Sequence, residues 1–174
     1  MNPNQWSTVL PFCAIATLLS VSYGWLVKNR KLALNPVMAF SDVQVQFIKV
    51  WAKLAAAIGI ILPLVMWIVF WHQPVARVFF GCYLFTIVVQ LFSETIFSRI
   101  LCKSVVVMIG TLYTGFRIWQ LWLGLHLIAY SQPWLTLLWL DLLFWIANMI
   151  MLTVMAIPSL FPRSNYSLSE EKVN

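Results

Sequence analysis

Residues 104–130 read SVVVMIGTLYTGFRIWQLWLGLHLIAY, an apolar run with one charged residue, Arg117, near its middle. A helix that crosses a bilayer needs about 20 predominantly apolar residues, and this stretch is long enough. A charged side chain at that depth is expensive, so it marks a candidate functional site. The segment therefore predicts a membrane-spanning helix and indicates that Arg117 belongs to a candidate functional site.

The composition of the whole chain indicates the same class of protein. Of its 174 residues, 62% are hydrophobic and only 9% are charged, whereas soluble domains carry about 25% charged residues. Cys13, Cys82 and Cys102 form no CxxC pair and have no histidine at ligand spacing, so neither a redox pair nor a metal site is predicted. The net charge of +6 comes from residues at the ends of apolar segments, which indicates membrane topology and not nucleic acid as a partner.

We expect an all-α integral membrane protein, an antiparallel bundle of five transmembrane helices in one domain, 1–161. The joints at 72–74, 99–103 and 131–133 are short, and short joints force consecutive helices to be antiparallel neighbours. The first segment lacks a charged leader and exceeds the apolar length of a signal peptide, so we expect it to be retained as a span. The polar residues 162–174 are expected to form a mobile tail. The predicted spans are 6–27, 54–71, 78–97, 104–130 and 134–161.

The distribution of lysine and arginine predicts the orientation, because cytoplasmic loops near span ends carry the excess of these residues. With the N-terminus outside and the C-terminus inside, only Arg77 lies on the outer side. The inner side then holds Lys28, Arg30, Lys31, Lys49, Lys53, Arg99, Lys103, Arg163 and Lys172.

An amphipathic entry helix is expected before the second span, with Ser41 as its N-cap. A short strand is the alternative, because residues 43–47 also alternate between apolar and polar. Lys49 and Lys53 would anchor the helix to lipid headgroups on the inner surface, or the helix would dock a soluble partner. At helical spacing, Asp42, Gln46, Lys49 and Lys53 share one face, and Val43, Phe47, Val50 and Leu54 share the opposite face.

A polar cluster is predicted inside the bundle, around Arg117. We expect Arg117 to meet Glu94 directly, while Gln90 and Asn148 satisfy its remaining donors. The cluster either fixes helix register or lines a cavity that holds a polar headgroup or a proton, with Glu94 or Asp141 able to carry that proton. Residues three, four and seven apart share a helix face, and on that basis the set comprises Gln90, Glu94, Tyr113, Arg117, Gln120, Asp141 and Asn148, with Tyr83 and Trp145 on the same faces.

A second stripe lies opposite Arg117 on the same helix and contains Trp119, Trp122, His126 and Tyr130. It is interpreted either as an aromatic belt at headgroup level or as a face where a pigment, a haem or a partner helix stacks, with His126 as an axial ligand. His72 is placed at the same membrane level.

The sequence favours a non-enzymatic protein that acts by association, as an accessory or assembly subunit of a membrane complex or as a binder of a lipophilic ligand. A small transporter or channel that uses Glu94, Arg117 and Asp141 is the alternative, and a lipid-modifying enzyme ranks below it. Because no GxGxxG, HExxH or GxSxG motif and no phosphate-binding loop occurs, no catalytic residue, metal ligand or cofactor is assigned. The expected partners are the bilayer and, within it, another subunit or a lipophilic ligand.

Overall fold

The computed structural model describes residues 5–38, 40–127 and 130–161, and within these ranges all regular structure is helical. The all-helical prediction is therefore confirmed. The polar tail predicted for 162–174 lies outside the described residues. The elements are α1 (Trp6–Lys28), α2 (Asp42–Ala56), a π-helical turn (Ala57–Ile61), α3 (Leu62–Val69), α4 (Pro74–Ile100), α5 (Val105–Leu127), α6 (Trp134–Met151), a second π-helical turn (Leu152–Ala156) and a 3-10 turn (Pro158–Leu160).

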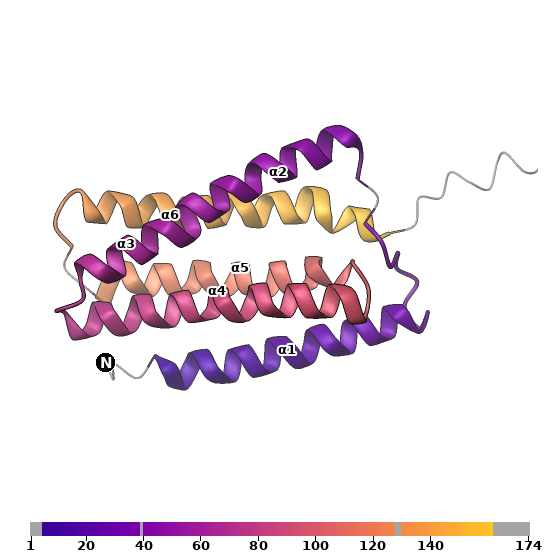
Figure 1. Cartoon of the computed structure of the whole chain (residues 1–174), viewed down its shortest axis with the longest axis horizontal. Coiled ribbons are helices and arrows are strands. Elements are labelled where there is room, and N and C mark those ends of the chain that lie inside the picture. The colour runs from indigo at the N-terminus through magenta and orange to yellow at the C-terminus, as the bar shows by residue number, and fades with distance from the viewer. Residues whose placement is uncertain (1–4, 39, 128–129, 162–174) are drawn as a thin grey trace, which may run out of the picture.

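The helices pack side by side, and successive helical bodies run in alternating directions (Figure 1). Helix α5 is central, because it packs against α1, α4 and α6. Four bodies are long and apolar enough to cross a membrane, namely Trp6–Lys28, Asp42–Val69, Pro74–Ile100 and Trp134–Leu160. The chain is therefore a helical bundle with several membrane-span-like helices, in which α5, the helix with the buried cation, packs against α1, α4 and α6.

The segment 42–69 is one continuous helical body, in place of the separate entry helix and span that the sequence predicts. It begins at Ser41 with a capping box: Ser41 Oγ accepts from the Gln44 backbone N–H, and Gln44 Oε1 accepts from the Ser41 backbone N–H. The helix, and not the alternative strand, is thus confirmed. The π-helical turn directly precedes the helical turn that contains Pro63, a residue that has no backbone N–H to donate.

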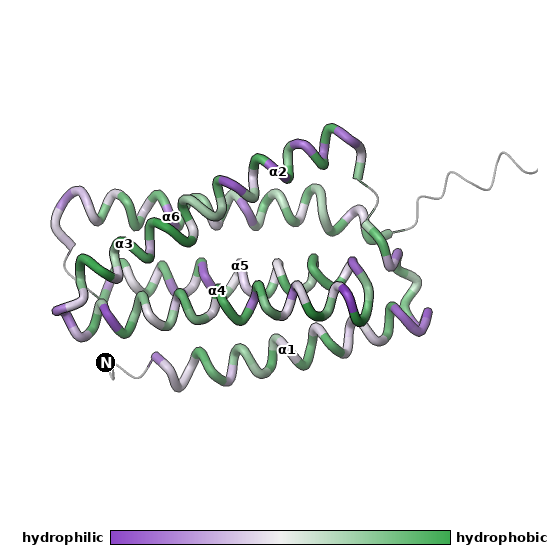
Figure 2. Tube along the Cα trace, in the orientation of Figure 1, coloured by the Kyte–Doolittle hydropathy of each residue, from purple (hydrophilic) through white to green (hydrophobic). Residues whose placement is uncertain are grey.

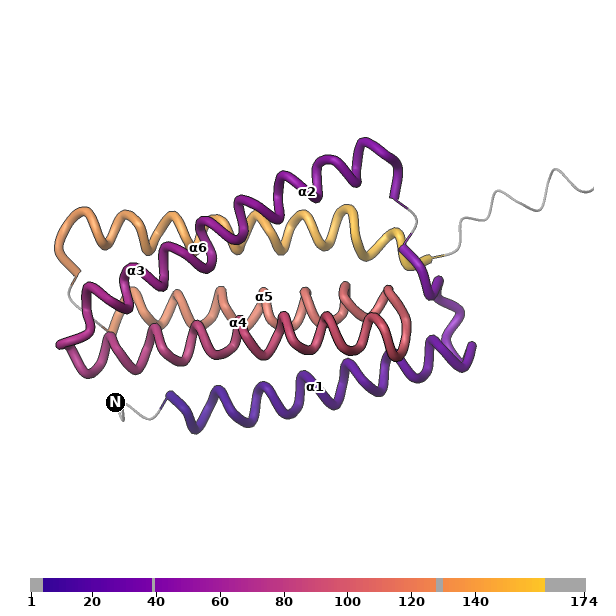
Figure 3. The backbone as a smooth tube through the Cα atoms, in the orientation of Figure 1, coloured from indigo at the N-terminus to yellow at the C-terminus, as the bar shows by residue number. Residues whose placement is uncertain are grey.

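Helix α2 projects from the bundle and buries none of its residues (Figure 3). The predicted apolar face of α2 and its lysine face are both exposed. A different face, which includes Ile48 and Trp51, is turned toward α6. Trp51 stacks on Phe144 of α6 with ring centroids 5.2 Å apart. Hydrophilic residues mark α2 and the ends of the bundle, while the remaining helices are mostly hydrophobic (Figure 2).

The connection between α1 and α2 is held against the ends of two other helices. The Asn35 backbone N–H donates to the Leu160 carbonyl at 2.7 Å, and the Ser104 N–H donates to the Pro36 carbonyl at 3.1 Å. The end of α1 and the starts of α2 and α5 consequently lie at the same end of the bundle (Figure 1).

Close contact between α4 and α5 depends on Gly124. A Cβ atom at this position would lie 2.3 Å from Phe79 Cζ, far inside van der Waals contact. The Phe79 ring is itself buried and packs edge-on against Phe80 at 4.9 Å, so it has little room to yield. Gly110, on the same helix, is less constrained, because its Cβ would meet Leu152 Cδ1 at 3.7 Å.

We expect Gly124→Ala to destabilise the bundle by about 1–3 kcal/mol, the usual cost of overpacking a core. Gly110→Ala is the matched control and should be neutral or stabilising by up to about 1 kcal/mol, because alanine is the better helix former. Thermal unfolding of both variants in one mild detergent measures the difference. Equal melting temperatures for the two variants would contradict the close packing described here.

Candidate functional site

Arg117 lies in the middle of α5 with only 2% of its surface exposed. Its Nη2 donates a hydrogen bond to Gln90 Oε1 of α4, and Gln90 Nε2 donates to Glu94 Oε1 at 2.6 Å. The three residues meet as their helical spacing suggested, but Gln90 takes the place next to the guanidinium that was expected for Glu94. Gln90 and Glu94 are one turn apart on α4, so the amide bridges the cation and the carboxylate.

The other side of the guanidinium is covered by an indole. Arg117 Cζ lies 4.3 Å from the ring centroid of Trp145 on α6, which is a cation–π contact. Such a contact offsets part of the missing hydration of a buried cation, because the negative face of the ring replaces water. Trp145 also fills the space above Gly59, where a Cβ would lie 2.3 Å from Trp145 Cζ2.

Tyr83 connects this indole to the acidic residue of α6. Trp145 Nε1 donates to Tyr83 Oη at 2.7 Å. The Tyr83 hydroxyl in turn lies 3.3 Å from the Gly59 carbonyl oxygen and 3.5 Å from Asp141 Oδ1. A phenol has one proton, so Tyr83 donates to one of these two acceptors at a time. We call Tyr83, Gln90, Glu94, Arg117, Asp141 and Trp145 the Arg117 cluster.

Asn148 does not join the Arg117 cluster, contrary to the expectation that it would satisfy the guanidinium. Its Nδ2 donates to Thr114 Oγ1 of α5 at 3.0 Å, and its Oδ1 accepts from Trp51 Nε1 of α2 at 2.7 Å. Asn148 lies beside Thr114, almost one turn from Arg117 along α5, which accounts for the different partner. The sequence analysis did not identify Trp51 as a partner of Asn148. Trp51 lies on neither the predicted apolar face nor the lysine face of α2.

Two further predicted members also lie apart from the guanidinium. Tyr113 packs on Phe12 of α1, with ring centroids 5.2 Å apart. Gln120 Oε1 lies 3.4 Å from Thr86 Oγ1 of α4. Both are buried, as their spacing predicts; Gln120 meets α4, one of the expected walls of the cluster, whereas Tyr113 meets α1, which was not among them.

Two charged atoms of the Arg117 cluster have no hydrogen-bond partner among the described residues. They are Arg117 Nε and Asp141 Oδ2, and both are buried. Nε can donate and Oδ2 can accept, so the described residues leave one donor and one acceptor of the cluster unused. No group of three or more His, Cys, Asp or Glu side chains comes together in the part of the chain that the structure describes.

The aromatic stripe is an exposed face built by α5 and α6. Trp119 and Trp122 are 44% and 51% exposed, and Trp139 of α6 lies edge-on to Trp122 at 6.4 Å. His126 Nδ1 lies 2.8 Å from the Trp122 carbonyl oxygen. A carbonyl only accepts, so Nδ1 is the donor in this contact, and in the neutral ring Nε2 would be the nitrogen that can accept. We call Trp119, Trp122, His126 and Trp139 the tryptophan face.

Tyr130 does not belong to the tryptophan face, and its assignment to the stripe is wrong. Leu127 is the last described residue of α5, and the ring of Tyr130 packs edge-on against Phe70 at 5.6 Å. His72 is exposed in the connection between α3 and α4. Lys49 and Lys53, the predicted surface anchor, are both exposed on α2.

Comparison of the chain with protein-family models, with curated proteins and with solved structures finds no match.

We expect Gln90→Leu to destabilise the bundle by about 1.5–3 kcal/mol, the contribution of a hydrogen bond to a charged group. The substitution keeps the side chain close in size but leaves the buried guanidinium without its acceptor. Gln46→Leu, the same change on the exposed side of α2, should leave the melting temperature unchanged in detergent. If the two variants melt together, Gln90 does not compensate Arg117.

Proposed function

We propose that the chain is a non-enzymatic, five-span membrane protein that acts by association with another membrane subunit or a lipophilic ligand. Four helices meet the length and apolarity of spans, and α5 packs among them in the same bundle. The proposed orientation puts the N-terminus outside and the C-terminus inside. It is supported by the clustering of Lys28, Arg30, Lys31 and Lys103 at the end of the bundle where α1 ends and α5 begins.

The observation that carries the proposal is the tryptophan face. Tryptophan is enriched among the residues that dominate binding energy at interfaces, because it offers a large, rigid, partly polar contact. The rings of Trp119, Trp122 and Trp139 stay exposed even though the chain buries other aromatic side chains such as Phe79 and Tyr83. His126 adds an exposed imidazole, a side chain that suits a partner hydrogen bond or, through its second ring nitrogen, axial ligation of a flat, metal-bearing ring.

The hydrogen bonds in the interior of the bundle also support the proposal. Side chains of α2, α4, α5 and α6 are linked by hydrogen bonds through Trp51, Asn148, Gln90 and Tyr83. These bonds join one helix to another, which is what is needed to hold register in a medium without water. Recognition of a partner is therefore assigned to the outer surface, and structural cohesion to the interior.

We expect the protein to migrate in blue-native gels well above its monomer mass after mild extraction, or to retain a bound lipophilic ligand in native mass spectrometry. The double substitution Trp119→Leu and Trp122→Leu should abolish that association. Trp71→Leu is the matched control, because Trp71 is also 44% exposed but lies at the end of α3. A bare monomer from native membranes, or equal effects of both changes, would overturn the proposal.

A transporter or channel is the second candidate, and the unpartnered atoms Arg117 Nε and Asp141 Oδ2 favour it. It requires an aqueous route to the Arg117 cluster. Single cysteines replacing Gln90, Glu94 and Arg117, in a chain whose three native cysteines are changed to alanine, test this with a water-soluble maleimide added from either side. Function by association predicts no labelling at these positions, and labelling from one side would establish the route.

A further inference from the structure

Helix α1 ends in a turn that places basic side chains beside an exposed tryptophan. The Arg30 N–H donates to the Val27 carbonyl at 3.0 Å, and the Lys31 N–H donates to the Leu26 carbonyl at 2.9 Å. These two bonds define a Schellman motif, in which glycine usually occupies the left-handed position. Here that position is Arg30, with φ of 55°. An L-residue pays a steric cost in this conformation, so the chain keeps a cation where glycine would be more stable.

The turn folds Lys31 back over the last full turn of α1. Lys31 Nζ lies 4.6 Å from the ring centroid of Trp25. Lys28 lies between them in sequence, and its Nζ donates to the Ile100 carbonyl at the end of α4, at 2.8 Å. The segment 28–41 contains three basic residues and no acidic residue. The positive charge at this end of α1 is thus not neutralised by its own segment.

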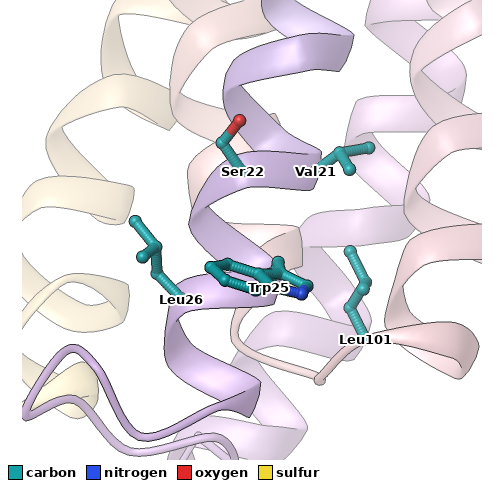
Figure 4. Close-up of a pocket in the computed structure, with 5 residues that line it drawn as sticks. All are labelled: Val21, Ser22, Trp25, Leu26 and Leu101. Atoms are coloured by element: carbon teal, nitrogen blue, oxygen red, sulfur yellow. The ribbon is translucent and has the colours of Figure 1, made fainter.

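An open pocket of about 370 Å³ lies on the surface of α1, and Trp25, the ring that Lys31 contacts, is part of its lining. Its lining is apolar apart from the Ser22 hydroxyl and the indole N–H, and the Trp25 ring lies between Leu26 and Leu101 (Figure 4). Leu101 can approach α1 this closely because of Gly24, where a Cβ would lie 2.7 Å from Leu101 Cδ1. The pocket is lined by Val21, Ser22, Trp25, Leu26 and Leu101.

We propose that this pocket binds one acyl chain of an anionic phospholipid, with the lipid phosphate held by Lys31 and Arg30. The apolar wall suits hydrocarbon, and the cations stand at the end of the helix, where headgroups begin. Indole rings favour this headgroup level, and basic residues there attract anionic lipids. Charge complementarity selects the occupant, because an open apolar pocket alone would accept any acyl chain.

The opposite end of the bundle provides an internal comparison. Arg77 Cζ lies 5.4 Å from the ring centroid of Trp71, so a cation and an indole also meet there. Arg77 is the one lysine or arginine between Phe70 and Gly81, where the neighbouring His72 is the other titratable base. The two ends therefore share the cation–tryptophan pair but differ in the number of cations, which makes Arg77→Gln a matched control.

The test is a titration of the delipidated full chain in detergent with phosphatidylglycerol or phosphatidylcholine, followed by native mass spectrometry. We expect phosphatidylglycerol to bind more tightly. Lys31→Gln should weaken its binding about fivefold, because one basic residue near an anionic membrane surface contributes about 1 kcal/mol. Lys31→Arg should bind as the unaltered chain does, and Arg77→Gln should have no effect.

Arg30→Gly separates lipid binding from folding. Glycine adopts the left-handed conformation without a Cβ penalty, so the variant should melt at the same or a higher temperature while it binds phosphatidylglycerol less tightly. Three results would overturn the proposal. They are equal affinity for the two lipids, equal effects of Lys31→Gln and Arg77→Gln, and displacement of bound phosphatidylglycerol by millimolar inorganic phosphate.

This lipid site is independent of the tryptophan face, because the end of α1 and the end of α5 lie at opposite ends of the bundle (Figure 1). Loss of phosphatidylglycerol binding in Lys31→Gln with blue-native migration unchanged would place the lipid at α1 alone. Loss of association in the Trp119 and Trp122 variant with lipid binding intact would assign the tryptophan face separately. Failure of either proposal thus leaves the other open to its own test.

Discussion

A guanidinium inside an apolar bundle has to be compensated by the protein itself, because hydrocarbon supplies no hydrogen bonds. Arg117 meets this constraint with an amide from α4 and an aromatic face from α6. These two contacts require three helices to be in register at one depth. The position of Trp145 depends in turn on two further residues. Its indole N–H donates to Tyr83, and its ring occupies the space left by the missing side chain of Gly59.

The contacts of the polar interior differ in kind from those that hold α1. The hydrogen bonds of the interior link α2, α4, α5 and α6, whereas α1 packs on α4 and α5 through apolar and aromatic contacts such as Phe12 with Phe116 at 3.8 Å. A polar contact of α1 to α4 lies in its last turn, where Lys28 Nζ donates to the Ile100 carbonyl at 2.8 Å. The cationic turn at the end of α1 and the tryptophan face toward the end of α5 are at opposite ends of the bundle.

Helical periodicity was a reliable guide to which positions are interior and a poor guide to which neighbours they meet. Gln90, Glu94 and Arg117 could be brought together from spacing, because two of them share a face of one helix and all three lie at one depth. Asn148 was assigned to the wrong partner and the contact of Tyr113 with Phe12 was not foreseen, because rotation of each helix about its axis depends on packing against several others. Trp51 was missed because α2 turns toward the bundle a side that is neither its most polar nor its most apolar.

The sequence by itself determined the class of protein, the approximate helical segments and the presence of a cation at the centre of α5. These properties depend on composition and on local spacing along the chain. Only the tertiary structure decided that Gln90 bridges Arg117 and Glu94, that Tyr130 leaves the aromatic stripe and that Lys31 returns over Trp25. Such contacts depend on where a helix ends, how it is rotated and how closely glycine lets its neighbour approach. These are three-dimensional consequences of packing that no single segment encodes.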